Sequence, residues 1–178
     1  MEYPKGIVVA ACTSETTGIR KTPVPSIELR QEHGIVGDAH AGPWHRQVSL
    51  LAMESIRKMQ AMGLHVGPGD FAENITTEGI DVKTLPIGTR LTCGDTLLEI
   101  TQIGKVCHTH CAIYQQAGDC VMPKEGVFAR VLRGGAITPQ SLIEVVEWGN
   151  GTRTRRDPAA ELPASTPHGV NLVSLGTR

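Results

Sequence analysis

Short runs of apolar residues, separated by glycine and proline, recur along most of this sequence. Continuous runs of small and β-branched residues predict buried strands, and alternation of polar and apolar residues predicts strands with one solvated face. The 20 glycines and 11 prolines leave few windows for long helices. The pattern predicts strands at residues 6–12, 26–30, 47–51, 73–77, 89–93, 96–103 and 142–146.

Helical periodicity is confined to short windows. Met53, Ile56 and Met59 recur at the helical period among good helix formers, and Gly63 ends this window, so we predict a helix there. Residues 127–132, with arginine between apolar side chains and two glycines following, predict a second short helix. The predicted fold class is mainly β with short helices, an α+β arrangement.

The composition changes after residue 148. Residues 149–178 are rich in Gly, Thr, Arg, Pro and Ala, and they hold few large apolar side chains for burial. We therefore expect one folded domain over residues 1–148 and a flexible C-terminal tail over residues 149–178. A length of 178 residues agrees with one domain.

The charge balance narrows the classes of partner. Seventeen basic and 18 acidic residues give a formal net charge of -1, which disfavours non-specific binding to nucleic acid or to an anionic membrane. Neither a run long enough to span a membrane nor a signal-peptide layout is evident, so we expect a cytoplasmic protein. In a reducing compartment, the five cysteines are expected to persist as thiols.

Soft metal ligands are concentrated in one stretch of fourteen residues: Cys107, His108, His110, Cys111 and Cys120. A helix over residues 107–117 would place Cys107, His110 and Cys111 on one face, where they could share a metal or a substrate. A zinc site at Cys107, Cys111 and Cys120 is one interpretation. Zinc sites usually contain two closely spaced pairs of thiols, however, and here the second pair is incomplete.

A reactive thiol at Cys107 is the interpretation that fits its neighbours better. Lys105 and His108 flank Cys107 with positive or potentially positive charge, which favours the thiolate. The three residues are therefore the catalytic candidates. The alternative is that Cys107 is a small buried hydrophobe, the role we assign to Cys12 and Cys93 within apolar strands.

A glycine-rich loop at residues 37–46 forms a second group of polar candidates. Asp38, His40 and Arg46 supply a carboxylate, an imidazole and a guanidinium, which together could grip a phosphorylated ligand. Turn chemistry explains the loop equally well, with Asp38 bonded to nearby backbone N–H groups. Asn74, in a turn that enters a strand, could orient a polar ligand or serve the structure alone.

Four segments in order carry a family resemblance: residues 37–40, 46–51, 68–79, and 98–102 with Cys107. Together they resemble the MOSC domain, the molybdenum cofactor sulfurase C-terminal domain family. The resemblance extends from about Gly6 to Val146 and implies a MOSC-type β-barrel. It also implies a link to the molybdenum cofactor (molybdopterin), a pterin dithiolene that bears a phosphate and a metal.

The resemblance also suggests roles for the candidate residues. The family's proposed sulfur carrier or molybdenum ligand falls on Cys107. Arg46 and His40, in the loop with Asp38, would meet phosphate or pterin oxygens, and Asn74 would bond the pterin edge. Lys105 would hold Cys107 ionised. The chain departs from the family where a proline commonly precedes this cysteine, and in its additional cysteines and histidines at residues 108–120.

Three functions follow from these observations. The first is binding of the molybdenum cofactor or a precursor, with Cys107 carrying sulfur as a persulfide or ligating the metal. The second is a molybdenum-cofactor-dependent reductase of N-hydroxylated compounds, and the third a non-enzymatic carrier of zinc or of the cofactor. The chain is too short to contain a pyridoxal-phosphate desulfurase domain. A separate sulfur-donor or electron-donor protein and an acceptor molybdoenzyme are therefore the expected partners.

Overall fold

The computed structural model describes residues 2–107 and 110–152. Its strands are β1 (Lys5–Thr13), β2 (Thr22–Val24), β3 (Ile27–Arg30), β4 (Gly34–Ile35), β5 (Val48–Ala52), β6 (Ile75–Glu78), β7 (Arg90–Cys93), β8 (Thr96–Ile103), β9 (Val127–Arg133), β10 (Gly135–Ile137) and β11 (Leu142–Glu147). Its helices are α1 (Met53–Ala61), α2 (Ala112–Ala117) and α3 (Met122–Glu125), with a 3-10 turn, η1 (Val82–Thr84).

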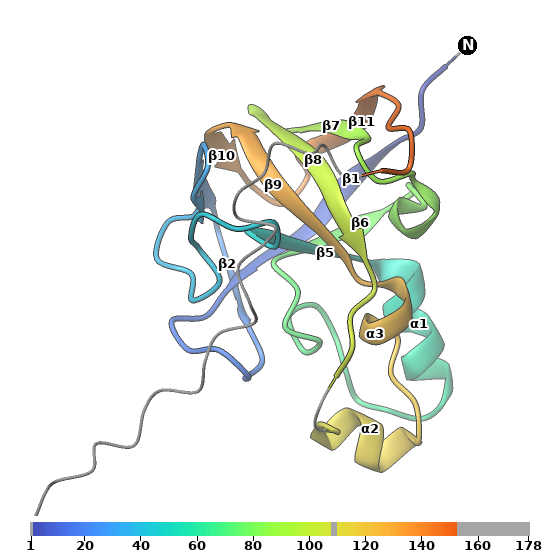
Figure 1. Ribbon diagram of the computed structural model, residues 1–178. Coiled ribbons are helices and arrows are strands. Elements are labelled where there is room, and N and C mark those ends of the chain that lie inside the picture. Colours follow the sequence, from blue (N-terminus) through green and yellow to red (C-terminus); the bar gives the residue numbers. More distant parts are fainter. Residues whose placement is uncertain (1, 108–109, 153–178) are drawn as a thin grey trace, which may run out of the picture.

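Seven strands close into a β-barrel, with the three helices gathered at one end (Figure 1). The strand order is β1-β11-β7-β8-β9-β5-β6, and β6 pairs with β1 to complete the ring. All of these pairs are antiparallel except β5 with β6, which run parallel. A smaller sheet contains β10, β3 and β4. The prediction of a mainly β fold with short helices is confirmed.

Two apolar cores stabilise this arrangement. The first fills the barrel, where inward-facing residues such as Leu50, Leu91 and Ile100 are fully buried. The second joins the helical end to the barrel and includes Ile56 of α1 and Ile113 of α2. The helices α2 and α3 are short and contribute few buried residues of their own. Their positions on the barrel therefore depend on packing within this second core.

Two helix predictions need correction. Residues 127–132 lie in β9, where Val127, Ala129 and Val131 are fully buried and the strand pairs with β5 and β8. Their spacing of two is a strand period, which the helical interpretation overlooked. In the second stretch, α2 begins only at Ala112, so Cys107 does not share a helical face with Cys111.

The segment that follows the barrel is described only as far as residue 152. Gly149 donates its N–H to the Thr89 hydroxyl, and Gly151 donates its N–H to the Ile87 carbonyl. The beginning of this segment is therefore bonded to the barrel. Residues 153–178, which make up most of the predicted tail, lie outside the described residues. In the described ranges, no helix has the length and apolar character needed to cross a membrane.

Candidate functional site

A pocket of about 600 Å³ lies at the helical end of the molecule, where several separate segments meet. They are the loop between β1 and β2, the loop before β6, the segment after β8, and the residues around α2 and α3. The lining residues are Gly18, Ile19, Arg20, Asp70, Phe71, Ala72, Lys105, Cys107, His110, Cys111, Ala112, Ile113, Cys120 and Met122. The volume is in the range of sites for small organic ligands.

Three thiols line this pocket and differ in exposure. Cys107 and Cys111 are exposed, and Cys120 is buried. Burial is the largest cause that raises the pKa of Cys120, and negative charge at Cys111 or Cys107 raises it further. The two exposed thiols are therefore the ones available for chemistry, because a buried thiol that stays protonated is a poor nucleophile.

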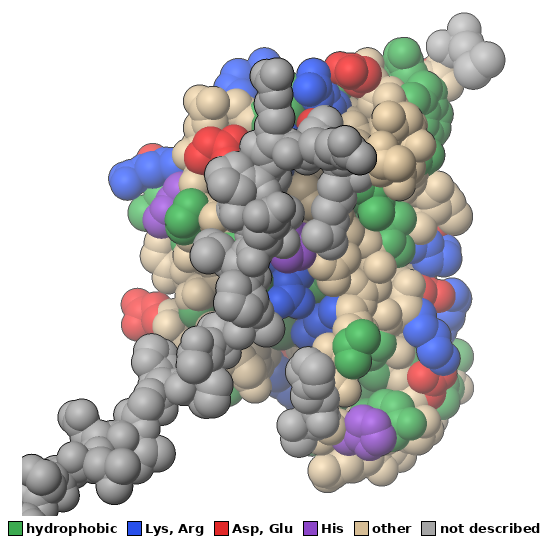
Figure 2. Space-filling model, in the orientation of Figure 1, with side chains coloured by type: hydrophobic (Ala, Val, Ile, Leu, Met, Phe, Trp, Pro, Cys, Tyr) green, Lys and Arg blue, Asp and Glu red, His purple; other side chains and the backbone are tan. Residues whose placement is uncertain are grey.

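Cationic and apolar groups complete the lining. Arg20 is paired with Asp70 at 3.3 Å between Nη1 and Oδ1, and its side chain remains largely exposed. The backbone of Lys105 is fixed by donation of its N–H to the Pro123 carbonyl at 3.0 Å. Figure 2 shows Lys and Arg side chains gathered near the middle of this face, between the barrel strands and α2. The pocket thus offers positive charge beside its thiols.

The loop before β6 forms one wall of the pocket and is held from below by Glu73. This fully buried carboxylate accepts hydrogen bonds from the N–H groups of Gly69 at 2.7 Å and Phe71 at 3.2 Å, and from the Thr76 hydroxyl at 2.8 Å. Burial raises the pKa of Glu73, and the hydrogen bonds oppose this rise. Ala72, with φ of 63°, holds a left-handed conformation that favours glycine.

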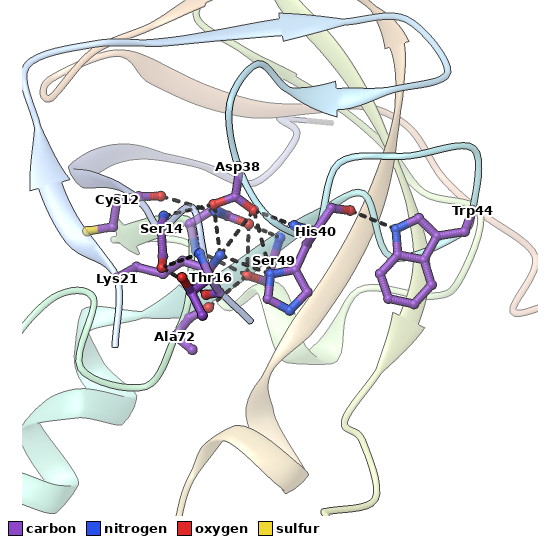
Figure 3. Close-up of polar contacts among 10 residues, drawn as sticks. Cys12, Ser14, Thr16, Lys21, Asp38, His40, Trp44, Ser49 and Ala72 are labelled. Carbon is purple, nitrogen blue, oxygen red and sulfur yellow. Dashed lines mark hydrogen bonds and ion pairs between the residues drawn. The ribbon is translucent and has the colours of Figure 1, made fainter. Parts of the chain in front are cut away.

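Asp38 organises a second group of polar residues (Figure 3). Its side chain is fully buried and pairs with Lys21 Nζ at 2.8 and 3.0 Å. The N–H groups of Ser14 and His40 also donate to it, at 3.1 and 3.0 Å. Burial opposes ionisation of Asp38, but the hydrogen bonds that His40 and Lys21 supply outweigh it, so the pKa of Asp38 lies well below its ordinary value.

His40 lies between this buried network and the surface. Its Nδ1 lies 3.0 Å from Lys21 Nζ and 3.6 Å from Asp38 Oδ1. Trp44 stacks against His40 and donates its indole N–H to the His40 carbonyl at 2.7 Å. The Arg46 guanidinium lies over the Trp44 ring, 4.7 Å from its centroid. The loop therefore presents an imidazole beside a cation on an aromatic surface.

Asn74 is fully buried, and all its side-chain hydrogen-bonding capacity is used internally. Its Oδ1 accepts from the Ser49 N–H and hydroxyl, both at 3.1 Å. Its Nδ2 donates to the Cys12 carbonyl and to Asp38, both at 3.1 Å. This geometry favours a positioning role, in which Asn74 holds Asp38, over direct contact with a pterin edge.

The structure brings some of the predicted residues together and leaves others apart. Lys105, Cys107, Cys111 and Cys120 share the pocket, whereas the candidates of the 37–46 loop do not line it. Two short links join the groups. Lys21, bonded to Asp38, follows Arg20 of the pocket in sequence, and its N–H donates to the carbonyl of Gly69 in the pocket wall.

The remaining expectations concern metal binding and His108. Among residues 2–107 and 110–152, no group of three His, Cys, Asp or Glu side chains is arranged to hold a metal ion. Cys107, Cys111 and Cys120 all lie in these ranges and do not form such a group in this structure, so a metal site there stays a prediction. His108 lies outside the described residues.

Two basic residues of the site, Arg20 and Lys21, were not singled out in the sequence. They lie in a polar loop with no recognisable motif, and they become informative only through partners 50 and 17 residues away. Two adjacent basic residues are the one local signal, and that signal occurs in many surface loops.

The described part of the chain is thus a closed β-barrel with a thiol-lined pocket at its helical end. The model of the MOSC domain family matches residues 37–144, more than half of the chain, and the protein belongs to that family. The family is linked to the molybdenum cofactor. The comparison with curated proteins found no match.

Solved structures share this fold. The YuaD protein from Bacillus subtilis superposes with a TM-score of 0.70 at 17% identity, covering 82% of this chain and 97% of that one. YiiM from Geobacillus stearothermophilus superposes with a TM-score of 0.58 at 24% identity, covering 83% of this chain and 78% of that one. YiiM from Escherichia coli superposes with a TM-score of 0.57 at 20% identity, covering 83% of this chain and 70% of that one. At these identities the likeness shows the fold, which is the MOSC-type barrel that the sequence predicted.

Proposed function

We propose that this protein binds the molybdenum cofactor or a molybdopterin precursor as its substrate, and that Cys107 carries sulfur to it or ligates its metal. One observation carries the proposal: in a MOSC-family chain, an exposed cysteine opens onto a pocket of about 600 Å³ that also holds cationic side chains. A thiolate is a soft donor, suited both to sulfur transfer and to a thiophilic metal.

The pocket's other residues fit a phosphorylated pterin. Arg20 and Lys105 supply positive charge for a phosphate, and Phe71 and Ile113 supply apolar surface for the face of a ring system. A phosphate could replace Asp70 as the partner of Arg20, because that pair is solvent-exposed on the arginine side. When bound, the ligand would supply a dithiolene-held metal that accepts sulfur.

The chain's own residues then have distinct tasks. Cys107 holds the sulfur, and Lys105 places positive charge in the same pocket. The network of Asp38, Lys21 and Asn74 holds the loops next to the pocket in place. His40 and Arg46 present donors at the adjacent surface, where an extended ligand or a partner would meet them.

The sulfur has to come from outside this chain. We expect a separate persulfide-bearing donor protein to load Cys107 and a molybdoenzyme to receive the sulfurated product. The exposure of Cys107 supports this exchange, since a donor must bring its own sulfur within bonding distance of the acceptor thiol.

The test is metal and pterin analysis of the full chain purified from a host that makes the cofactor. We expect wild-type protein to retain pterin with molybdenum, and Cys107→Ser to lose the metal or both. Cys111→Ser, a change at another exposed thiol of the same pocket, is the matched control and should retain both. Zinc without pterin, retained in Cys107→Ser until Cys111 and Cys120 are also replaced, would instead show a metal-carrying cluster and refute the proposal.

A further inference from the structure

Cys111 is a second exposed thiol of the pocket, and the proposed function gives it no task. It lies immediately before α2 and lines the same pocket as Cys107, with three residues between them in sequence. Both cysteines also act on one neighbour, because negative charge at either raises the pKa of Cys120. The three sulfur atoms therefore share one electrostatic environment within the pocket.

The electron balance of sulfur delivery gives such a second thiol a use. The outer sulfur of a cysteine persulfide is at oxidation level zero, whereas a metal takes up sulfur as sulfide, which is more reduced by two electrons. A carrier with one thiol needs an outside reductant for every transfer. A second thiol in the same pocket can supply both electrons by forming a disulfide with the first.

We propose that Cys111 is the resolving thiol of this pocket and releases the sulfur carried on Cys107 as sulfide. The Cys111 thiolate attacks Sγ of the persulfidated Cys107. A bond forms between the two Sγ atoms, the bond from Cys107 Sγ to the outer sulfur breaks, and its electron pair leaves with that sulfur as hydrosulfide.

This step balances within the pocket. The outer sulfur gains two electrons, which the two cysteine sulfurs lose together, and the proton of the Cys111 thiol passes to solvent. The disulfide is then reduced by a dithiol reductant, which restores both thiols for the next cycle. No oxidant is required, because the persulfide is itself the electron acceptor.

The sequence spacing of the two cysteines permits this disulfide. A disulfide needs Cα atoms about 4.4–6.8 Å apart, a separation that a chain can reach across three intervening residues. Cys111 has extended backbone angles, φ −77° and ψ 173°, and helical geometry begins only after it. Its carbonyl accepts the Gln115 N–H at 3.0 Å, so Cys111 is held at the start of α2 with its thiol exposed at the pocket.

Cys120 provides a contrast within the same pocket. It is buried among apolar side chains, and burial raises the pKa of its thiol, so it remains protonated. It therefore cannot replace Cys111 as the attacking thiolate. Cys120→Ala is accordingly a matched control that removes a pocket thiol without removing the resolving one.

The inference rests on the sulfur-carrying role proposed for Cys107, and one experiment tests both. The reduced full-length chain is loaded with inorganic polysulfide, desalted, and followed for released sulfide and for cysteine state by peptide mass spectrometry. We expect the wild type to release sulfide without added thiol and to end with a Cys107–Cys111 disulfide. Cys111→Ser should keep the Cys107 persulfide and release sulfide at least about tenfold more slowly until a dithiol is added. Cys120→Ala should behave as the wild type.

The contrary outcomes separate the two proposals. Equal release from the wild type and Cys111→Ser, or a disulfide that joins Cys107 to Cys120 or to a second copy of the chain, overturns the resolving role and leaves the carrier role standing. Failure of Cys107 to take up a persulfide in both proteins overturns the carrier role, and the resolving role with it.

Discussion

At the scale of single residues, the pairing of Lys21 with Asp38 stands out because both side chains are almost fully buried. Replacing Asp38 with Asn leaves the Lys21 ammonium buried without its counter-charge. We expect the free energy of unfolding, measured by urea denaturation near neutral pH, to fall by about 3–5 kcal/mol. The control is Asp81→Asn, which removes an exposed ion pair with Lys83 and should lower the free energy of unfolding by about 0–1 kcal/mol.

The effect of pH on this pair has a definite sign. The pKa of Asp38 is lowered in the folded protein, so its ionisation stabilises the fold at pH values above the ordinary aspartate pKa of about 3.9. This contribution is lost as the pH falls through the lower folded value. The stability difference between wild type and Asp38→Asn should therefore be full near neutral pH and shrink in acid. A difference that persists unchanged to the acid limit of folding would contradict the assignment.

Residues of the site differ in how far the sequence revealed them. Cys107 could be predicted, because a thiol among basic and imidazole side chains is a local pattern. The tasks of Asn74 and Lys21 could not, because each depends on partners that only the folded barrel brings near. By residue type, Asn74 is suited to contact a ligand. In the structure it is buried and bonded to Asp38, which favours a positioning role instead.

At the scale of elements, the pocket wall between α1 and β6 depends on a glycine that cannot be replaced without movement. Gly69 has φ of 89°, and a Cβ there would lie 2.1 Å from the Lys21 carbonyl oxygen. Gly63, with φ of 91°, has nothing within 4 Å of such a Cβ. Gly63→Ala should therefore lower the free energy of unfolding by about 1–2 kcal/mol, the cost of the left-handed backbone conformation alone.

Gly69→Ala adds the steric conflict to this same conformational cost. We expect a further loss of about 1–3 kcal/mol in the free energy of unfolding, because backbone has to shift. The shift would fall on the Arg20–Lys21 segment and hence on the pocket. Equal losses for the two variants, compared by chemical denaturation, would show that the wall yields without cost and that the close approach is not a constraint.

The elements themselves were predicted unevenly. The pattern located β8 at its observed bounds, because Leu98 and Ile100 alternate with Glu99 in a run that glycines at positions 94 and 104 delimit. It failed for β9, where apolar residues and arginines over a short window satisfy both the helical and the strand period. The strands β2 and β10, of three residues each, are too short to carry a period and depend on pairing with β1 and β3.

At the scale of the whole molecule, the cysteines divide into two populations. Cys12 and Cys93 are fully buried in the barrel, and burial raises the pKa of each to about 12. Brief treatment of the native protein with iodoacetamide near neutral pH should therefore modify Cys107 and Cys111 first, with Cys120 slower and the barrel thiols protected. Peptide mass spectrometry reads the order, and denatured protein, in which all five react, is the control.

The single parallel pair of strands in the barrel accounts for one wall of the pocket. Two adjacent parallel strands cannot be joined by a tight turn, so the chain that leaves β5 has to travel the length of the barrel before it enters β6. That return path contains α1 and the loop held by Glu73. The topology thus obliges the protein to carry a long external connection, and this connection brings Asp70, Phe71 and Ala72 to the pocket without altering the register of the barrel.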